Sequence, residues 1–407
     1  MIPFHEALSI VESQEHRLET EFVELSSAQG RCLSDAPKST IDHPPFTKAA
    51  MDGYAVSRGD TSAELRILET IAAGDVPAQE VGPGTCSRIM TGAMLPAGAD
   101  KVHRVEYAEE REGYMIPSRA EPARNVIERG ENLTAGESAL GPRLLAPQDI
   151  GVAASLGLAR LEVVRMPHVG IIATGSELAE PGSEPAAGGI YNSNAYQLIA
   201  HARSAGCAPT YYGIAEDTEA ALEEVLGRAF AAEDIIILTG GVSKGEFDYV
   251  PGVLGRAGVE VLFHRVAMKP GRPTLFGRRE TPAPGGRGEG PGRDPGGTQY
   301  VFGLPGNPVS AFVTFEVFVK ALLYRLAGLR FSPPLVPATL SVAIDKKDAE
   351  RTEFIPVRWN GSTVEPVRYG GSSHLSALAD TDALLMLDVG TTRLETGARV
   401  DVRPIRT

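Results

Sequence analysis

Small and acidic residues follow four apolar runs of the sequence, at the points where those runs end. Residues 174–177 (TGSE) follow GIIA, residues 216–218 (EDT) follow YYGIA, and residues 240–248 (GGVSKGEFD) follow IIILT. Residues 304–308 (LPGNP) follow the fourth run, YVFG. In a doubly wound sheet the carboxyl ends of parallel strands share one edge, and ligands bind beyond that edge. The spacing therefore predicts that the four turns form one site.

The turn residues suit a phosphate or another oxyanion. Asn307 is a good N-cap and Pro308 fits the first helical position, so a helix is predicted to begin there. Its free N–H groups and the positive end of its dipole favour an anion. Gly306 lets a ligand approach the backbone, and the turn at residues 240–241 can do the same. Ser243 either caps that turn or contacts the ligand.

Three carboxylates in these turns, Glu177, Asp217 and Asp248, would repel an anion unless a divalent cation lies between them. Magnesium (Mg²⁺) takes one or two carboxylates together with phosphate oxygens. The acids therefore predict a magnesium site with Glu177 and Asp248 as ligands. Asp217 beside Thr218 also matches a simple helix N-cap. Asp234 precedes its strand, so we expect it at the opposite edge of the sheet.

The segment RVAMKPGRPT adds three cations, Arg265, Lys269 and Arg272, on a backbone that prolines stiffen. Charge-assisted hydrogen bonds from such a segment suit the oxygens of an oxyanion. Each cation taken alone is typical of a solvated surface, so the prediction depends on their lying together. The sequence has no GxxxxGK[ST] motif, which argues against a P-loop NTPase.

The elements that must position these residues follow from the pattern of the chain. In residues 166–327, apolar β-branched runs alternate with helical patterns, which indicates a central, doubly wound, mainly parallel sheet with helices on both faces. Residues 46–132 predict a β-rich inserted domain, because short strands alternate with Gly/Pro turns. Residues 1–45 and 133–165 predict a mixed α/β N-terminal and linking domain. Residues 328–407 predict a small C-terminal β-domain.

The composition limits the class of protein. The chain has 407 residues, of which 43% are hydrophobic, enough for the cores of several domains. Its net charge of −13 argues against nucleic acid as a partner. The three cysteines form no CxxC pair, so we expect neither a disulfide framework nor a zinc site. With no signal peptide and no membrane-spanning run in the sequence, we expect a cytoplasmic protein. The Gly/Pro/Arg-rich residues 278–299 predict a mobile loop between two strands.

Eight stretches of the sequence resemble the molybdopterin molybdenumtransferase family, the MoeA type that includes the gephyrin E domain. They are PPFTKAAMDGYAV, RIMTGAMLPAGAD, NVIERGENL, IIATGSEL, GGIYNSNAYQL, LTGGVSKGEFDYV, MKPGRPT and GLPGNPVSAFVTFEVF. Weaker matches, RTEF and GSSHLSAL, follow in the last domain. The resemblance covers essentially the whole chain. It implies a fold of the molybdenum cofactor biosynthesis type and a homodimer of four-domain subunits, with each active cleft between domains of both chains.

The resemblance also implies a reaction. The family cleaves adenylylated molybdopterin in a Mg²⁺-dependent step and transfers molybdate to the dithiolene, which yields molybdenum cofactor and AMP. An adenylyltransferase is a possible partner protein. Three alternatives stay open: a scaffold of the gephyrin E-domain type, a tungstate-preferring paralogue, and a related transferase on the same sheet.

Matching motifs carry the family's catalytic roles onto individual residues. The aspartate of AMDGYA is Asp52 and the threonine of RIMTGA is Thr91, and both also fit turn chemistry in a β-rich domain. The resemblance implies catalytic roles for these two residues and for the acids of three strand-end turns, Glu177, Asp217 and Asp248.

The predicted substrate contacts fall in two groups. The strand-end turns contribute Gly240, Gly241, Ser243, Pro305, Gly306, Asn307 and Pro308. The molybdate subsite that the resemblance implies comprises Lys269, Arg272 and Pro273, with Ser310, Arg351 and Ser373 as further candidates for the same oxyanion pocket. Arg265, from the same charged segment, is a further predicted substrate contact.

Four positions depart from the family pattern. Asn132 stands where aspartate is usual, Ala49 where serine precedes AMDG, and Pro356 where a second arginine would be expected. Arg265 stands where lysine is common, which keeps the charge but changes the geometry of its donors. Asn132 keeps an acceptor and loses the charge of the acid.

Overall fold

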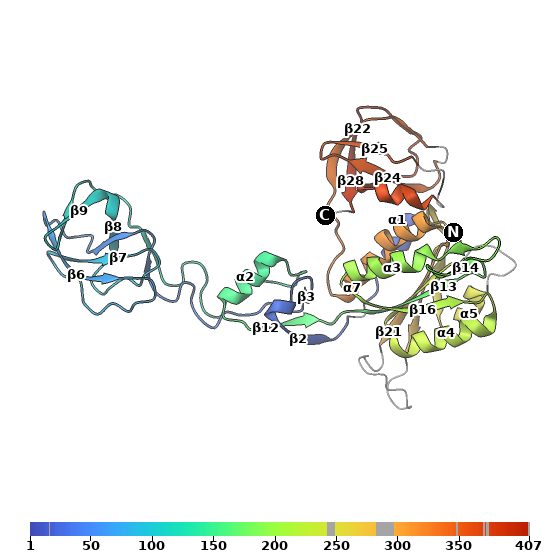
Figure 1. The fold of residues 1–407 in the computed structure, drawn as a ribbon, viewed down its shortest axis with the longest axis horizontal. Helices are drawn as coiled ribbons and strands as arrows, with labels where there is room; N and C mark the ends of the chain where they lie inside the picture. Colours follow the sequence, from blue (N-terminus) through green and yellow to red (C-terminus); the bar gives the residue numbers. More distant parts are fainter. Residues whose placement is uncertain are drawn as a thin grey trace. The chain divides into compact units, whose positions relative to one another are not determined.

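The computed structural model describes the whole chain except residue 16 and residues 242–248, 282–296, 347–348, 369–370, 372–373 and 406–407. The chain forms two compact units (Figure 1). Unit 1 comprises Met1–Glu21, Gly30–Ser34 and Val163–Thr407, and unit 2 comprises Phe22–Gln29 and Asp35–Glu162. The finer division into four domains stays a prediction.

A six-stranded sheet forms the centre of unit 1. Its strands, in spatial order, are β16 (Ala208–Ala215), β13 (His168–Thr174), β17 (Ile235–Thr239), β21 (Thr298–Leu304), β20 (Leu275–Glu280) and β18 (Glu260–His264). The first four strands run parallel, and β20 runs antiparallel to both of its neighbours. Every residue of β17 is buried, as expected for a strand covered on both faces. The prediction of a mainly parallel sheet is confirmed.

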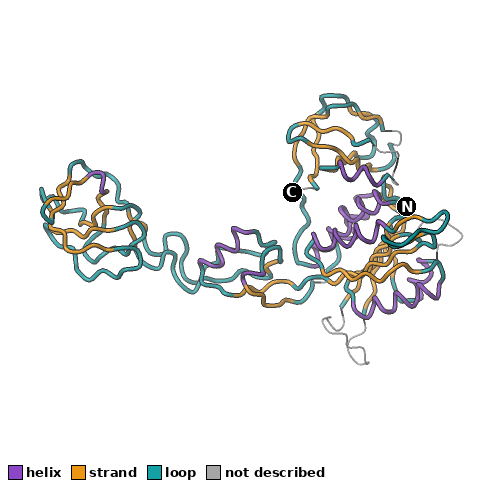
Figure 2. Tube along the Cα trace, viewed as in Figure 1, coloured by secondary structure: helices purple, strands orange, loops and turns teal. Residues whose placement is uncertain are grey.

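Helices cover both faces of this sheet (Figures 1 and 2). Ile237 of β17 packs with Leu198 of α3 in one hydrophobic cluster, and Ile236 packs with Leu226 of α4 in the other. The helices are α3 (Ser193–Ser204), α4 (Glu219–Ala232), α5 (Val250–Arg256), and a long helix made of α6 (Pro308–Thr314), the π-helical segment η3 (Phe315–Val319) and α7 (Lys320–Leu326). The sheet is therefore doubly wound, as the alternating pattern predicts.

The C-terminal residues of unit 1 form the small β-domain that the sequence predicts. Its seven-stranded sheet has the order β1 (Ile2–Pro3), β19 (Val266–Lys269), β24 (Thr352–Trp359), β25 (Thr363–Pro366), β22 (Val336–Leu340), β28 (Arg399–Pro404) and β26 (Ala383–Leu387). Around it lie α1 (Phe4–Glu12), the pair β23 (Ile344–Asp345) with β27 (Arg393–Leu394), and the 3₁₀ helix η4 (Leu375–Asp380). β19 precedes the KPGRP turn, so this sheet also positions the predicted oxyanion segment.

Unit 2 contains the β-rich insertion. Its six-stranded sheet has the order β8 (Lys101–Arg104), β5 (Gly53–Val56), β7 (Thr85–Ile89), β6 (Leu65–Ile71), β10 (Tyr114–Pro117) and β9 (Ala108–Arg111). Its smaller elements are β4 (Lys48–Ala49), η2 (Val105–Tyr107), β11 (Val126–Ile127), η1 (Leu25–Ser27) and α2 (Pro147–Ser155). The strands β2 (Thr20–Glu24), β3 (Cys32–Leu33) and β12 (Arg160–Val164) form a separate three-stranded sheet.

Three further expectations concern single features. The three cysteines are buried and free, so no disulfide forms. None of the described helices is long and apolar enough to cross a membrane. The loop predicted at residues 278–299 is too long at both ends, because β20 extends to Glu280 and β21 begins at Thr298, where the two strands pair. Residues 282–296 lie outside the described part of the chain.

Candidate functional site at the carboxyl edge of the sheet

The four predicted turns share one edge of the central sheet. The parallel registers pair Thr174 with Ala215, Ala173 with Thr239, and Thr239 with Leu304. The carboxyl ends of β16, β13, β17 and β21 are therefore neighbours in space. The edge that the strand pattern predicts is present in the structure.

The turn after β17 is packed against the end of β13. A Cβ atom on Gly240 would lie 2.3 Å from the Thr174 carbonyl oxygen, and one on Gly241 would lie 2.8 Å from Thr174 Oγ1. Both glycines have positive φ, +95° and +64°. The Gly240 N–H donates to the Leu304 carbonyl at 3.2 Å. The close approach of Thr174 and the positive φ angles therefore require glycine at both positions. This requirement holds whether or not the turn also binds a ligand.

Asn194 joins two of the turns, and reasoning from the sequence missed this residue. Its Nδ2 donates to Thr239 Oγ1 at 2.9 Å and to the Gly306 carbonyl at 2.6 Å. The side chain comes from the first turn of α3, which Asn192 caps by accepting from the Ala195 N–H at 3.2 Å. The only signal in the sequence is the doubled asparagine of YNSNAYQL at a helix start.

Asp217 joins the other two turns. Its Oδ2 accepts a hydrogen bond from the Ser176 backbone N–H at 3.1 Å. Thr218, rather than Asp217, is the N-cap of α4, because its side chain accepts from the Ala221 N–H at 3.3 Å. Gly175, Ser176, Asp217 and Thr218 line a cavity of about 570 Å³ between these turns. Asp217 therefore shapes the wall of a cavity at the predicted edge.

The Glu177 carboxylate is exposed and folds back over its own turn. A Cβ atom on Gly175 would lie 2.6 Å from Glu177 Oε2, so the glycine leaves room for this carboxylate. The short parallel strands β14 (Leu178–Ala179) and β15 (Ile190–Tyr191) hold the segment, and the Ile190 N–H donates to the Glu177 carbonyl at 2.9 Å. The strand pairing and this hydrogen bond therefore hold the backbone at Glu177 in place.

The helix after β21 begins as predicted, with Asn307 at the N-cap and Pro308 at the first helical position. Gly306 lies against the turn after β17, because a Cβ atom there would be 3.6 Å from the Gly240 Cα. Pro305 lies between β21 and this cap. Ser310 is buried, with 3% of its surface exposed, so a direct contact with a ligand would need it to become accessible.

The KPGRP segment is a tight turn between β19 and β20. The Thr274 hydroxyl donates to the Gly271 carbonyl at 2.6 Å, and the Val266 N–H donates to the Arg272 carbonyl at 3.0 Å. A Cβ atom on Gly271 would lie 2.6 Å from Thr314 Cγ2, so the turn packs directly against the end of α6. The predicted stiffness of the segment therefore has a structural cause beyond its prolines.

The cations near this turn differ in their partners. Lys269 Nζ lies 2.6 Å from Oε1 of the buried Glu353. Arg272 is exposed, and no ion pair joins it to another described residue. Arg265 has a positive φ of +77°, and its backbone bonds to Ile2 and Thr274. Arg351 directly precedes β24, which pairs with β19 beside the turn.

Asp52 and Thr91 form a pair in unit 2. Oδ1 of Asp52 accepts from the Thr91 hydroxyl and from the Thr91 backbone N–H, each at 2.6 Å. These hydrogen bonds, the hydroxyl first, hold the pKa of Asp52 below its usual range. Both residues are exposed. A Cβ atom on the next residue, Gly53, would lie 2.1 Å from the His103 carbonyl, so packing explains the glycine of this motif.

Several predicted positions lie elsewhere or cannot be placed. Asp234 is at the opposite edge, as expected, where its carboxylate binds the Arg165 guanidinium at 2.7 and 2.8 Å. Asp248, Ser243 and Ser373 lie outside the described residues. Within the described ranges, no group of three or more His, Cys, Asp or Glu side chains could hold a metal ion.

Three family models match the chain in order. The MoeA N-terminal region (domain I and II) matches residues 2–157, a probable molybdopterin binding domain matches residues 170–325, and the MoeA C-terminal region (domain IV) matches residues 338–405.

Relatives with curated names and solved structures match over nearly the full length. A molybdopterin molybdenumtransferase of Staphylococcus aureus (strain MRSA252) is 32% identical over 98% of this chain and 95% of its own length. One from Staphylococcus epidermidis (strain ATCC 12228) is 31% identical with the same coverage. The crystal structure of a molybdopterin biosynthesis MoeA protein from Pyrococcus horikoshii OT3 has a TM-score of 0.84, with 30% identity over 99% of this chain and all of that one.

Proposed function

Since the chain belongs to the MoeA family of molybdopterin molybdenumtransferases, enzymes of molybdenum cofactor biosynthesis, we propose that it cleaves adenylylated molybdopterin and transfers molybdate to the dithiolene. The products are molybdenum cofactor and AMP. The proposal includes Mg²⁺ dependence, a homodimer in the cytoplasm, and delivery of the substrate by an adenylyltransferase partner. The observation that carries it is that four strand-end turns, which together contain glycines and acids, lie at one edge of the sheet.

The strand edge supplies groups for the adenylylated phosphates. The Gly240–Gly241 turn and the helix that begins at Pro308 lie near each other, since a Cβ atom on Gly306 would be 3.6 Å from the Gly240 Cα. The Gly240 N–H is bound to the Leu304 carbonyl, so the helix start is the main source of backbone amides in the proposal. Backbone amides at a helix start bind phosphate oxygens without a charged side chain. Asn194 holds both turns in place, so the amides are oriented before the substrate binds.

The described part of the site contributes one carboxylate for a magnesium ion. Glu177 offers an exposed carboxylate between Ser176 and Leu178, which line the same cavity as Asp217, and Mg²⁺ is usually bound by one or two carboxylates together with substrate phosphates. In the proposal Glu177 holds the ion together with Asp248. When bound, Mg²⁺ would neutralise phosphate charge as the phosphate bond breaks. Asp217 keeps the Glu177 turn in position through the Ser176 amide.

The KPGRP turn supplies the molybdate subsite of the proposal. Arg272 has an exposed guanidinium on a backbone fixed by two internal hydrogen bonds and by α6, so it loses little conformational entropy when it binds an oxyanion. Lys269 already neutralises Glu353, which leaves Arg272 as the main cation for molybdate.

The direct test is incubation of the purified protein with adenylylated molybdopterin, MgCl₂ and molybdate, with AMP and active cofactor measured separately. The proposal predicts stoichiometric release of both products, and loss of both when the metal is chelated. Cofactor formation without AMP release would overturn the assigned substrate. A parallel series with tungstate in place of molybdate tests the tungstate-preferring alternative.

A further inference from the structure

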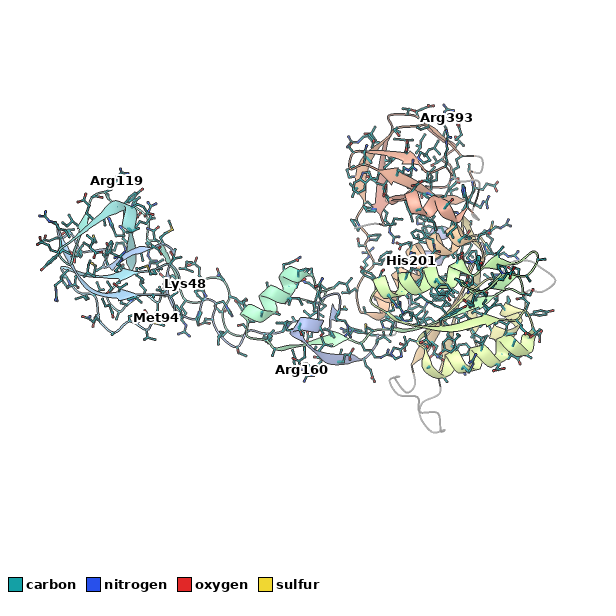
Figure 3. All side chains as sticks on the ribbon, viewed as in Figure 1. Lys48, Met94, Arg119, Arg160, His201 and Arg393 are labelled. Atoms are coloured by element: carbon teal, nitrogen blue, oxygen red, sulfur yellow. The ribbon has the colours of Figure 1, made fainter. Side chains whose placement is uncertain are left out.

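A cavity of about 610 Å³, within the range of small-molecule sites, lies between α4, the end of α5 and the end of β20. α4 and α5 lie on the face of the central sheet away from α3, on which His201 is labelled in Figure 3. Arg279 of β20 pairs in register with Gln299, near the start of β21, so the cavity is at the amino edge of the parallel strands. We call it the amino-edge cavity, and the lining residues that carry the argument are Glu223, Leu226, Gly227, Phe230, Arg256 and Arg279. It shares no lining residue with the cavity at the carboxyl edge.

Arg279 contributes a positive charge to this cavity. Its guanidinium lies over the ring of Phe230, with Cζ 4.5 Å from the ring centroid, and its Nη1 donates to Gln299 Oε1 at 3.2 Å. Burial lowers the pKa of this guanidinium, and within the described ranges no carboxylate forms an ion pair with it. The charge is therefore partly desolvated, and a bound anion would compensate for the hydration that it has lost.

The other two charged side chains that line the cavity balance each other. Arg256 Nε donates to Glu223 Oε1 at 2.9 Å, and its Nη2 donates to Glu219 Oε2 at 2.6 Å. The described lining therefore has one positive charge in excess, that of Arg279. This excess suits a ligand with a single negative charge, whereas Glu223 would repel a dianion more strongly.

Gly227 keeps the cavity open although it weakens its own helix. It lies inside α4, where glycine is less favourable than alanine because of its backbone entropy. A Cβ atom at this position would meet no atom of the described chain within 4 Å outside the backbone of its own helix, so packing does not require the glycine. The glycine instead leaves space beside Leu226 and Phe230, whose apolar side chains line the cavity.

We propose that the amino-edge cavity binds a small monocarboxylate with an apolar body. The carboxylate would accept hydrogen bonds from the Arg279 guanidinium, whose planar donors match the two oxygens of a carboxylate. The apolar body would lie along Leu226 and Phe230, in the space that Gly227 leaves free. The proposal concerns ligand binding alone and does not depend on the reaction proposed at the carboxyl edge.

Isothermal titration calorimetry with ligands that share one apolar body tests the proposal. The ligands are 4-phenylbutyrate, 4-phenylbutan-1-ol and 4-phenylbutylamine, which carry an anionic, a neutral and a cationic group. The acid should bind at least about tenfold more tightly than the alcohol, and the amine most weakly, because only the acid pairs with a cation. Equal affinities for the acid, the alcohol and the amine would overturn the proposal, and so would the absence of acid binding at millimolar ligand.

Arg279→Met removes the charge and leaves an apolar side chain over Phe230. The affinity for the acid should fall at least about tenfold, so that the preference for the acid over the alcohol is lost. Arg278→Met is the matched control, because Arg278 is adjacent on β20, points to the other face of the sheet and binds Glu260 at 2.8 Å. A preference for the acid that survives in Arg279→Met would overturn the proposal.

Gly227→Phe tests the cavity independently of any charge. Its side chain would fill the open space, so the binding of the acid should be lost. Gly227→Ala adds one methyl group, and it should raise the melting temperature while it keeps most of the affinity. Both variants change an exposed helical position and should fold, which thermal unfolding checks. Unchanged affinity in Gly227→Phe would mean that the acid binds elsewhere, which would overturn the proposal. None of these results bears on the reaction at the carboxyl edge, which is assayed by AMP release.

Discussion

Lys269 and Glu353 form an ion pair between the parallel strands β19 and β24, with 2.6 Å between Nζ and Oε1. Glu353 is buried, whereas the Lys269 side chain is 45% exposed. The pair joins the KPGRP turn to the C-terminal β-domain. Lys269 and Arg272 look equivalent in the sequence, but only Lys269 has this buried partner, so we expect the two cations to have different roles.

Lys269→Met is expected to lower the free energy of unfolding by about 1–2 kcal/mol, because it leaves a buried carboxylate without its charged partner. Its effect on the molybdate dependence of insertion should be small at temperatures where the variant is folded. Chemical unfolding and molybdate titration measure the two quantities. The double variant Lys269→Met with Glu353→Gln should recover part of the lost stability, and no recovery would count against the pair.

Arg272→Ala should behave in the opposite way. The free energy of unfolding should change by less than about 0.5 kcal/mol, since the exposed side chain has no ion-pair partner among the described residues. The molybdate concentration for half-maximal insertion should rise about tenfold or more, because a charge-assisted contact to the oxyanion is lost. Molybdate is titrated at saturating adenylylated molybdopterin. An unchanged titration would show that Arg272 is only a surface charge.

Asp217 variants test whether this acid acts only through the Ser176 amide. Asp217→Asn keeps an oxygen that can accept from that amide, so the fold should be preserved within about 0.5 kcal/mol. If the charge is needed for catalysis, AMP release should fall by about a hundredfold or more. Asp217→Ala should lose both the amide contact and the activity. An active Asp217→Asn enzyme would reduce Asp217 to a structural link between two turns.

The sheet and its functional edge could be predicted from the sequence because both follow from local patterns. The β-branched run Ile235–Thr239 is buried at every position, which is what a continuous apolar run indicates. The turns come directly after such runs, so parallel strands bring them together. Asn307 and Pro308 mark a helix start by their residue types alone, and the structure places it there.

Contacts between distant parts of the chain could not be predicted in the same way. Nothing local indicates that β19 joins the C-terminal sheet, and this pairing is what gives Lys269 its partner Glu353. The Gly240–Gly241 pair was interpreted only as a ligand cradle, although Thr174 presses against both positions. Asn194 was missed because its role depends on the Thr239 hydroxyl and the Gly306 carbonyl, which come from other strands.

Asn194→Leu should therefore affect both stability and substrate binding. The Gly306 carbonyl and the Thr239 hydroxyl would lose their shared donor inside the protein, at a cost of about 2–3 kcal/mol. The amides of the two turns would no longer be held together, so the affinity for adenylylated molybdopterin should fall. Asn192→Ala is the matched control. It removes the cap of the same helix but leaves both turn contacts, so it should destabilise the fold without the loss of affinity.

Subunit mixing tests whether Asp52 completes the cleft of the partner subunit in the proposed homodimer. Asp52→Ala and Asp217→Ala subunits, each inactive alone, should regain part of the activity when they are mixed and exchanged. In a mixed dimer, one cleft would combine the intact turn of one chain with the intact Asp52 of the other. Exchange is verified by mass spectrometry with two tags. Full exchange without any activity would argue that each cleft is built within one chain.

Glu121 predicts a specific pH dependence for unit 2. Its carboxylate, which is fully covered, accepts from Arg104 Nε at 2.6 Å and Nη2 at 3.3 Å and from the Ala123 N–H at 3.2 Å. These bonds, the one from Arg104 first, lower the pKa of Glu121 from 4.5 to about 2. The folded pKa is below the unfolded value, so the stabilisation is complete above about pH 4.5 and is lost as the pH falls towards 2.

Glu121→Gln should consequently lower the free energy of unfolding by about 2 kcal/mol at pH 7, because a charge-assisted bond to Arg104 is weakened. The difference between the wild type and this variant should shrink steadily from pH 4.5 to pH 2, since the wild-type carboxyl is protonated over that interval. Denaturant unfolding at several pH values measures the difference and cancels the contributions of other acids. Glu109→Gln, at an exposed position of β9, is the control and should show no such trend. A constant difference across the whole pH range would mean that Glu121 contributes through packing and not through its charge.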